Sequence, residues 1–208
     1  MIHNPADAPR PRGNCGTLAP MADTLYARVL EGLEKAGEKT PARVLRAFYA
    51  ALDVLVKDKR DNFKRVLPLA DYLVDRWDKA KVLGFGEGTN VYDSCLVLGD
   101  VKVGKNCWIG PFTILDGSGG LEIGDNCTIS AGVHIYSHDN VQQTLDGSPI
   151  ERSPVKIGSR VYIGPQSVVT RGVTIGDRVV IGAQSLVNSD VASGTKVAGT
   201  PARVLGTV

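Results

Sequence analysis

Residues 155–188 read VKIGSRVYIGPQSVVTRGVTIGDRVVIGAQSLVN, and this stretch decides the fold. A branched aliphatic residue recurs at every sixth position: Ile157, Ile163, Val169, Ile175, Ile181 and Val187. Glycine directly follows four of these six residues. A six-residue repeat cannot keep to one face of an α-helix, which turns every 3.6 residues. A short strand and a tight turn fit it, because branched residues suit a half-buried pleated surface and glycine occupies turn conformations that a side chain disfavours.

The six-residue step also runs upstream, with one slip and one interruption. It holds from Val97 to Leu115, slips by two residues at Gly119-Gly120, resumes at Ile123 and stops after Ile135. Three units make a coil of about eighteen residues, and coils stack at the inter-strand spacing of roughly 4.8 Å. We therefore predict a β-solenoid in which residues eighteen apart lie above one another: Ile157 with Ile175, Ile163 with Ile181, and Val169 with Val187.

Composition divides the 208 residues into unlike parts. Residues 20–83 hold 23 of the 46 charged residues and two of the 24 glycines, whereas residues 84–208 hold 20 charged residues and 20 glycines. Together with the low aromatic content of 6%, this favours a narrow core of small aliphatic residues in the second part. We predict a disordered tail at 1–20, an α-helical region at 21–83 and the solenoid at 84–208.

The helical prediction rests on apolar spacing. A stripe runs from Val44 through Phe48 to Leu55, and Thr40-Pro41 supplies an N-cap followed by proline at the first helical position. A further apolar pattern follows Pro68. Two to four short helices are expected there, as a cap or an oligomerisation element.

The net charge and the cysteine content limit the classes of binding partner and the cellular location that we expect for this protein. The formal net charge of +2 gives no electrostatic case for nucleic acid or an anionic membrane. No stretch has the roughly 18 to 20 apolar residues of a membrane span, and the proline-rich start lacks the apolar region of a secretory signal. Four cysteines without an export signal indicate a reducing, cytoplasmic location. Cys95, Cys107 and Cys127 each precede a repeat aliphatic by two positions, so we expect them to point inward.

These motifs carry a resemblance to a known family. Residues 95–205 resemble the hexapeptide-repeat acyltransferases, and residues 197–205, VAGTPARVL, are similar to the family's terminal signature V-x-G-x-P-A-R-x-I. Residues 172–201 resemble the maltose, galactoside and polysaccharide O-acetyltransferase branch in particular. The resemblance implies an all-β solenoid, a left-handed parallel β-helix, that works as a homotrimer and uses acetyl-CoA to acetylate a sugar or sugar-nucleotide.

The interruption of the repeat is where we expect the chemistry. Ile135 and Ile157 are twenty-two positions apart, and the polar stretch 137–154 forms an extra loop, which is a common place for function on a solenoid. By resemblance, Tyr136-Ser137-His138-Asp139 matches the segment that holds the family's catalytic histidine. Imidazole suits a general base at neutral pH, since its ordinary pKa lies near 6.5. We predict that His138 is that base.

A carboxylate that orients the imidazole would complete such a site. Asp139, Glu151 and Asp116 are the candidates, and the sequence alone does not choose among them. We place Asp139 and Glu151 with His138 in the catalytic group. Asp116, His134 and Asn140 are expected to line the acceptor site.

The remaining candidates concern coenzyme A and are implied by the resemblance. No phosphate-binding glycine loop of a nucleotide-binding fold is present. The family instead places coenzyme A in a groove between neighbouring subunits, and Arg203 suits a phosphate there. Ser189 replaces a common lysine, for which Lys196 could substitute. The matching positions are Pro165, Ala183, Gln184, Asn188, Ser189 and Arg203.

Two other classes of function remain open. A zinc lyase similar to the γ-class carbonic anhydrases needs three histidines, and only His134 and His138 lie near each other in this sequence. A non-catalytic scaffold would fit the helical region. No metal is therefore expected. Nucleotide-sugar pyrophosphorylases also carry such a solenoid, but they need a larger nucleotide-binding domain than the first 83 residues provide, so we do not expect that activity.

Overall fold

The computed structural model describes residues 25–37 and 39–208. The chain divides into two compact units, one that ends at Asp61 and one that runs from Asn62 to Val208, and each is described by itself. The tail predicted at 1–20 lies outside the described residues.

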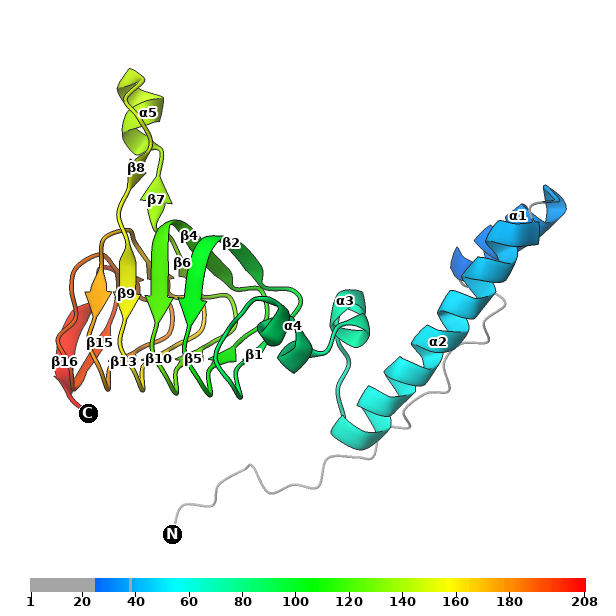
Figure 1. The fold of residues 1–208 in the computed structure, drawn as a ribbon, viewed down its shortest axis with the longest axis horizontal. Helices are drawn as coiled ribbons and strands as arrows, with labels where there is room; N and C mark the ends of the chain where they lie inside the picture. Colours follow the sequence, from blue (N-terminus) through cyan, green and yellow to red (C-terminus); the bar gives the residue numbers. More distant parts are fainter. Residues whose placement is uncertain (1–24, 38) are drawn as a thin grey trace, which may run out of the picture. The chain divides into compact units, whose positions relative to one another are not determined.

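The first unit is helical, as predicted. It contains α1 (Leu25–Lys35) and most of α2 (Lys39–Phe63) (Figure 1). The N-cap prediction differs by two positions, because α2 begins at Lys39 and Pro41 therefore lies inside its first turn. A proline is tolerated there, since the first four N–H groups of a helix have no partner within it. The expected stripe on α2 is partly covered, with Leu45, Leu52 and Leu55 half-buried.

The second unit opens with two short helices that fasten the first coil. They are α3 (Leu69–Leu73) and α4 (Arg76–Val82), and the carboxylate of Asp75 caps α4 by accepting from the N–H groups of its first turn. The buried carboxylate of Asp71 accepts a hydrogen bond of 2.6 Å from the N–H of Asp93. The ammonium of Lys79 donates to three backbone carbonyls of the turn at residues 92–95. These contacts close one end of the solenoid.

The rest of the unit is a parallel β-solenoid with three walls (Figure 1). The first wall consists of β1 (Asn90–Val91), β3 (Trp108–Ile109), β5 (Thr128–Ile129), β10 (Tyr162–Ile163), β13 (Val180–Ile181) and β15 (Thr195–Ala198), with β16 (Arg203–Thr207) antiparallel at its end. The second consists of the first halves of β2 (Leu96–Val103) and β4 (Ile114–Ile123), then β6 (His134–Ile135), β11 (Val168–Val169) and β14 (Leu186–Val187). The third consists of the second halves of β2 and β4, then β9 (Val155–Ile157) and β12 (Thr174–Ile175).

The predicted register is confirmed in all three pairs. Ile157 lies beside Ile175, Ile163 beside Ile181, and Val169 beside Val187. The repeat aliphatics point inward and form one continuous core. Cys95, Cys107 and Cys127 are buried in that core as free thiols, as expected. Burial raises the pKa of the Cys95 thiol.

The role predicted for the repeat glycines is wrong in its detail. None of those that follow the repeat aliphatics has a positive φ; a Cβ at Gly164 would instead lie 2.5 Å from the backbone nitrogen of Ala183 in the next coil. The left-handed backbone conformation occurs two residues later, at non-glycine residues such as Asn126 (φ 58°) and Gln166 (φ 59°). Where glycine follows the aliphatic residue, as at Gly164, close stacking of the coils rather than turn geometry therefore requires it.

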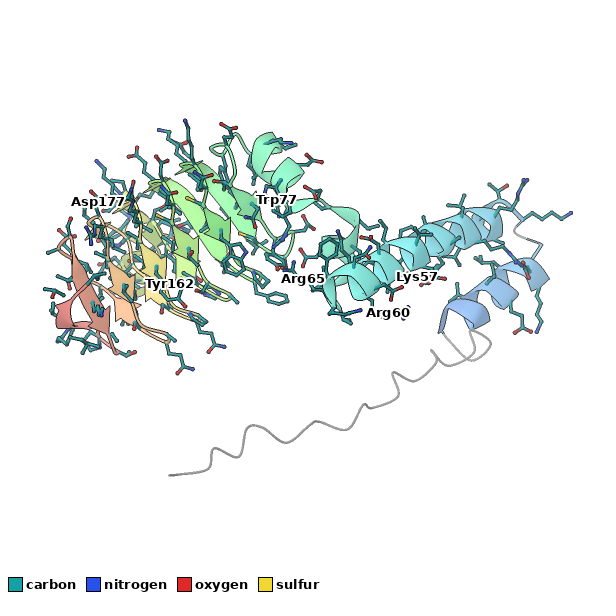
Figure 2. All side chains as sticks on the ribbon, turned by 90° about the horizontal axis from the view of Figure 1, so that it is seen from below. Lys57, Arg60, Arg65, Trp77, Tyr162 and Asp177 are labelled. Atoms are coloured by element: carbon teal, nitrogen blue, oxygen red, sulfur yellow. The ribbon has the colours of Figure 1, made fainter. Side chains whose placement is uncertain are left out.

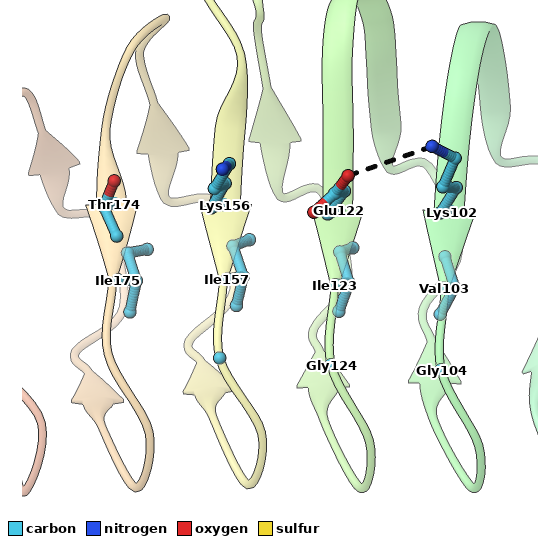
Figure 3. A pocket seen from close by; sticks show the side chains of 11 residues that line it. Lys102, Val103, Gly104, Glu122, Ile123, Gly124, Lys156, Ile157, Thr174 and Ile175 are labelled. Atoms are coloured by element: carbon cyan, nitrogen blue, oxygen red, sulfur yellow. Dashed lines mark ion pairs between the residues drawn. The ribbon is translucent and has the colours of Figure 1, made fainter.

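The three walls differ in the side chains that they present outward. The third wall carries Lys102, Glu122, Lys156 and Thr174 side by side on successive strands, and Lys102 pairs with Glu122 at 3.8 Å (Figure 3). A groove of about 630 Å³ runs across this wall. On the first wall, Tyr162 is 43% exposed (Figure 2). No helix among the described residues is both long and apolar enough to cross a membrane.

The stacking argument predicts the effect of adding one methyl group. Gly164→Ala should lower the free energy of unfolding by about 1–3 kcal/mol, because the new Cβ overlaps a backbone that cannot move freely within the stack. Lys156→Ala, an exposed position on the third wall, should change it by less than about 0.5 kcal/mol. Urea unfolding of both variants measures the difference. Equal stability of Gly164→Ala and the wild-type protein would contradict the role given to this glycine.

Candidate functional site

The interruption of the repeat is an arm that leaves the solenoid. We define the arm as residues 138–152; it contains β7 (His138–Asp139), the short helix α5 (Val141–Asp146) and β8 (Glu151–Arg152) (Figure 1). The strands β7 and β8 pair antiparallel, so the chain returns to the solenoid beside the point where it left. His138 is the first residue of the arm.

The imidazole of His138 contacts a fully buried carboxylate. Its Nδ1 lies 2.6 Å from Oδ2 of Asp116, whose side chain has no exposed surface, whereas the His138 side chain keeps 34% of its surface exposed. The same carboxylate accepts hydrogen bonds from the N–H of Ser137 at 2.9 Å and from the N–H of Ser118 at 3.0 Å. Asp116, which the sequence places in the acceptor group, is therefore the carboxylate in contact with His138.

These contacts keep Asp116 ionised. Burial alone raises the pKa of its carboxyl group, but the hydrogen bonds from Ser118, His138 and Ser137 outweigh burial and lower the pKa from 3.8 to about 2. An ionised carboxylate only accepts hydrogen bonds, so the hydrogen between the two side chains belongs to Nδ1 of His138. In a neutral imidazole Nε2 then carries the lone pair. This arrangement suits Nε2 to accept a proton from a substrate.

The slip at Gly119-Gly120 follows directly after the segment that carries Asp116. Strand β4 follows its neighbour β2 in register until Gly117, after which its pairing shifts by two residues. The extra backbone folds back, and the N–H of Gly119 donates to the hydroxyl of Ser137 at 2.7 Å. A Cβ on Gly119 would lie 2.4 Å from the carbonyl oxygen of Ser137, so glycine is required for this approach. Ser137 is itself fully buried and links β4 to the arm.

The other two candidate carboxylates contact an arginine that sequence reasoning missed. Nε of Arg171 lies 2.5 Å from Oδ2 of Asp139, and another guanidinium nitrogen hydrogen-bonds the carboxylate of Glu151. The hydrogen bond from Arg171, followed by that from the N–H of Val141, lowers the pKa of Asp139. Arg171 follows β11 and lies eighteen residues before Ser189, so the coil period was the signal that could have located it.

A pocket of about 330 Å³ opens beside His138. It is lined by Tyr136, His138, Asp139, Asn140, Thr170 and Arg171. Asn140, predicted for the acceptor, therefore lines the same pocket as His138. His134 does not line it; its Nδ1 lies 3.3 Å from the hydroxyl of Tyr136, and the two rings meet edge to face.

The residues predicted for coenzyme A are all exposed and fall into separate groups. Pro165, Ala183 and Gln184 share the corner between the first and second walls, where the N–H of Gln184 donates to the carbonyl of Pro165 at 2.9 Å. Asn188 and Ser189 follow β14, one coil beyond Thr170 and Arg171, and so continue the edge that carries the pocket. Lys196 and Arg203 lie on the paired strands β15 and β16.

Within residues 25–37 and 39–208, no group of three or more His, Cys, Asp and Glu side chains could hold a metal ion.

Comparisons with known proteins agree with the repeat. Residues 154–189 match the family described as bacterial transferase hexapeptide (six repeats), and residues 100–137 match the hexapeptide repeat of succinyl-transferase. Nodulation protein L of Rhizobium meliloti (strain 1021) is 38% identical over 110 residues, which make up 51% of this chain and 60% of that protein. The chain thus spans less than two thirds of the length of this relative.

Solved structures share the solenoid. AntD, an N-acyltransferase from Bacillus cereus, has been solved in complex with dTDP and 3-hydroxybutyryl-CoA; it is 27% identical with a TM-score of 0.54, over 59% of this chain and 71% of that one. A point mutant of the same enzyme, in complex with dTDP and coenzyme A, is 26% identical with a TM-score of 0.55, over 59% and 72%. A maltose O-acetyltransferase from Clostridium difficile 630 is 31% identical with a TM-score of 0.47, over 74% and 88%.

The lowered pKa of Asp116 predicts a specific loss of stability in acid. A carboxyl group with a pKa of about 2 in the folded state and 3.8 when unfolded stabilises the fold above pH 4 and loses this contribution as the pH falls to 2. That contribution amounts to about 2 kcal/mol. Asp116→Asn should therefore unfold more easily than wild type at pH 7, and the difference should shrink between pH 4 and pH 2.

Urea titrations at several pH values measure this difference. Asp100→Asn, which removes an exposed carboxylate from the same solenoid, serves as the matched control and should follow the wild-type curve. If the difference in the free energy of unfolding between Asp116→Asn and wild type stays constant from pH 7 to pH 2, the Asp116 charge does not stabilise the fold.

Proposed function

The repeat region of this chain is of the hexapeptide type found in bacterial transferases, and from this premise we propose that the protein transfers an acetyl group from acetyl-CoA to a hydroxyl or amino group of a sugar. The observation that carries the proposal is the hydrogen bond of 2.6 Å between His138 and the buried Asp116 at the edge of an open pocket. AntD, an N-acyltransferase solved with dTDP and 3-hydroxybutyryl-CoA, supports acyl transfer from a coenzyme A thioester.

In the proposed mechanism His138 acts as the general base. Its Nε2 takes the proton of the acceptor hydroxyl or amine as that atom attacks the thioester carbonyl. Asp116 holds the ring and stabilises the imidazolium that forms. The tetrahedral intermediate then collapses, the carbon–sulfur bond breaks, and the imidazolium returns the proton to the departing thiolate. General base catalysis of this kind contributes about 10²–10⁴-fold to the rate.

The acyl donor and the acceptor are proposed to enter from different sides of His138. The acceptor would occupy the pocket beside Tyr136 and Asn140. Asn188 and Ser189 continue the same edge, which is a suitable course for the pantetheine arm of acetyl-CoA. The exposed cationic side chains of Lys196 and Arg203 suit the phosphates of acetyl-CoA. The three buried free thiols and the use of acetyl-CoA favour a cytoplasmic location.

The second wall supports the proposed homotrimer. Its outward positions form an apolar ladder across successive coils, with His134 as the single polar member: Leu96, Ile114, His134, Val168 and Leu186. Leu96 is 56% exposed and the other four are half-buried. Contact with a second copy would remove this apolar surface from water. The third wall, with its lysines, is less suited to self-association.

Substitution of the base tests the proposed reaction. His138→Ala should reduce kcat about 10²–10⁴-fold, because no other group would accept the acceptor's proton. The measurement is release of free thiol from acetyl-CoA, with free sugars, nucleotide-linked amino sugars and glycan fragments as acceptors and succinyl-CoA as a second donor. The exposed variant Lys156→Ala is the control. Full activity in a folded His138→Ala variant would refute the mechanism, and absence of transfer to every acceptor by the wild-type protein would refute the function.

The apolar ladder predicts the oligomeric state. The wild-type chain should sediment as three copies, and Val168→Lys should sediment as a monomer, because it places a charge in the middle of the ladder. Thr174→Lys adds the same charge on the third wall and should leave the assembly intact. Sedimentation of wild type as a monomer, or of Val168→Lys as a trimer, would contradict an interface on the second wall.

A further inference from the structure

Arg171 joins the two strands of the arm at its base. Asp139 lies on β7 and Glu151 on β8, and the two residues are direct cross-strand partners. The guanidinium of Arg171 hydrogen-bonds both carboxylates. Arg171 belongs to the solenoid, in the turn after β11, so it ties both strands of the arm to the coil that follows the arm.

Little else holds the arm in place. Its helix α5 has no buried residue and no side-chain N-cap, and Leu145 is 72% exposed. At the base, the N–H of Ser153 donates to the carbonyl of Ser137 at 2.9 Å, and the N–H of Gly172 donates to the carbonyl of Ser153 at 3.2 Å. Without an apolar core, the arm depends on the pairing of β7 with β8, on these backbone bonds, on the contact of His138 with Asp116 and on the guanidinium.

The position of Arg171 also affects the charge around the proposed base. The ionisable side chains around His138 come from five parts of the unit: Asp116 on β4, His134 and Tyr136 on and beside β6, Asp139 on β7, Glu151 and Arg152 on β8, and Arg171 after β11. Asp139 and His138 interact electrostatically, and Arg171 holds the Asp139 carboxylate in an ion pair. The guanidinium therefore offsets the Asp139 carboxylate, which interacts with the imidazole, and the Glu151 carboxylate opposite Asp139 on β8.

We propose that Arg171 is a positioning residue: it fixes the arm on the solenoid and weakens the electrostatic effect of the Asp139 and Glu151 carboxylates on His138. This inference rests on the proposed function for its catalytic meaning. Asp139 and Glu151 are then the anchors of the arm, and Asp116 is the carboxylate that serves the base. Because Arg171 also lines the pocket, its position sets the shape of the site that the acceptor would enter.

The first test measures the arm without any reaction. In Arg171→Ala, amide hydrogen exchange within residues 139–151 should become at least about tenfold faster, because the arm opens more often. Arg171→Lys keeps the charge but loses the fork that reaches both carboxylates, so its exchange should fall between wild type and Arg171→Ala. Arg178→Ala removes an exposed arginine from the same solenoid and should exchange as wild type does. Unchanged exchange in Arg171→Ala would overturn the proposal.

The second test follows the protonation of His138 by NMR. In Arg171→Ala the two carboxylates are no longer offset and stabilise the imidazolium, so the ring should become half protonated at a higher pH than in wild type. Adding Asp139→Asn and Glu151→Gln to that variant should move this pH back towards the wild-type value. A merely structural role would give no such reversal. A pH of half protonation that stays the same or falls in Arg171→Ala would overturn the electrostatic part.

Activity separates this inference from the proposed function. Where the wild-type protein transfers acetyl groups, Arg171→Ala should move the acid limb of the kcat/KM profile to higher pH and should lower kcat. The variant that combines Arg171→Ala with Asp139→Asn and Glu151→Gln should return the acid limb towards its wild-type pH. Where the wild-type protein transfers none, the proposed function fails, and hydrogen exchange and the NMR titration still decide whether Arg171 holds the arm and offsets its carboxylates.

Discussion

Stacking of the coils in fixed register is the constraint on which the rest of the structure depends. Each coil places a branched aliphatic residue directly on its counterpart in the next, and at positions such as Gly164 the glycine that follows lets the two backbones approach. A solenoid held in this way tolerates a change in coil length only where the extra residues leave the stack. Both departures from the period, the slip at Gly119-Gly120 and the arm at 138–152, occur in this manner and meet beside His138.

That meeting explains how a regular scaffold acquires a histidine paired with a buried carboxylate. The N–H of Ser118 in β4 and the N–H of Ser137 just before the arm keep the buried carboxylate of Asp116 charged, while the arm begins with the imidazole that pairs with it. Four donor groups from two coils contact the Asp116 carboxylate, so its charge is stabilised without solvent. The pocket beside it remains open, because the arm leaves the solenoid instead of covering the edge.

Much of the fold could be predicted from the sequence, because a period of six with alternate burial has few structural solutions. The register of the core and the inward cysteines followed from it. The partner of His138 could not be chosen, because the slip changes the count of residues between Asp116 and His138 independently of the repeat. Arg171 was missed for a related reason: its two partners belong to the arm, whose path no period describes. The left-handed conformation at Gln166 and Asn126 was also unforeseen, since glycine was needed for stacking two residues earlier.

The most direct test of this account is the protonation state of the two ring nitrogens of His138. Nitrogen-15 NMR of selectively labelled protein, at a pH where the imidazole is neutral, distinguishes a protonated from an unprotonated ring nitrogen. The account predicts a hydrogen on Nδ1, shared with Asp116, and a bare Nε2; in Asp116→Asn this preference should weaken or reverse, because the amide can donate to Nδ1. A neutral wild-type ring with its hydrogen on Nε2 would contradict the assignment of His138 as a base oriented by Asp116.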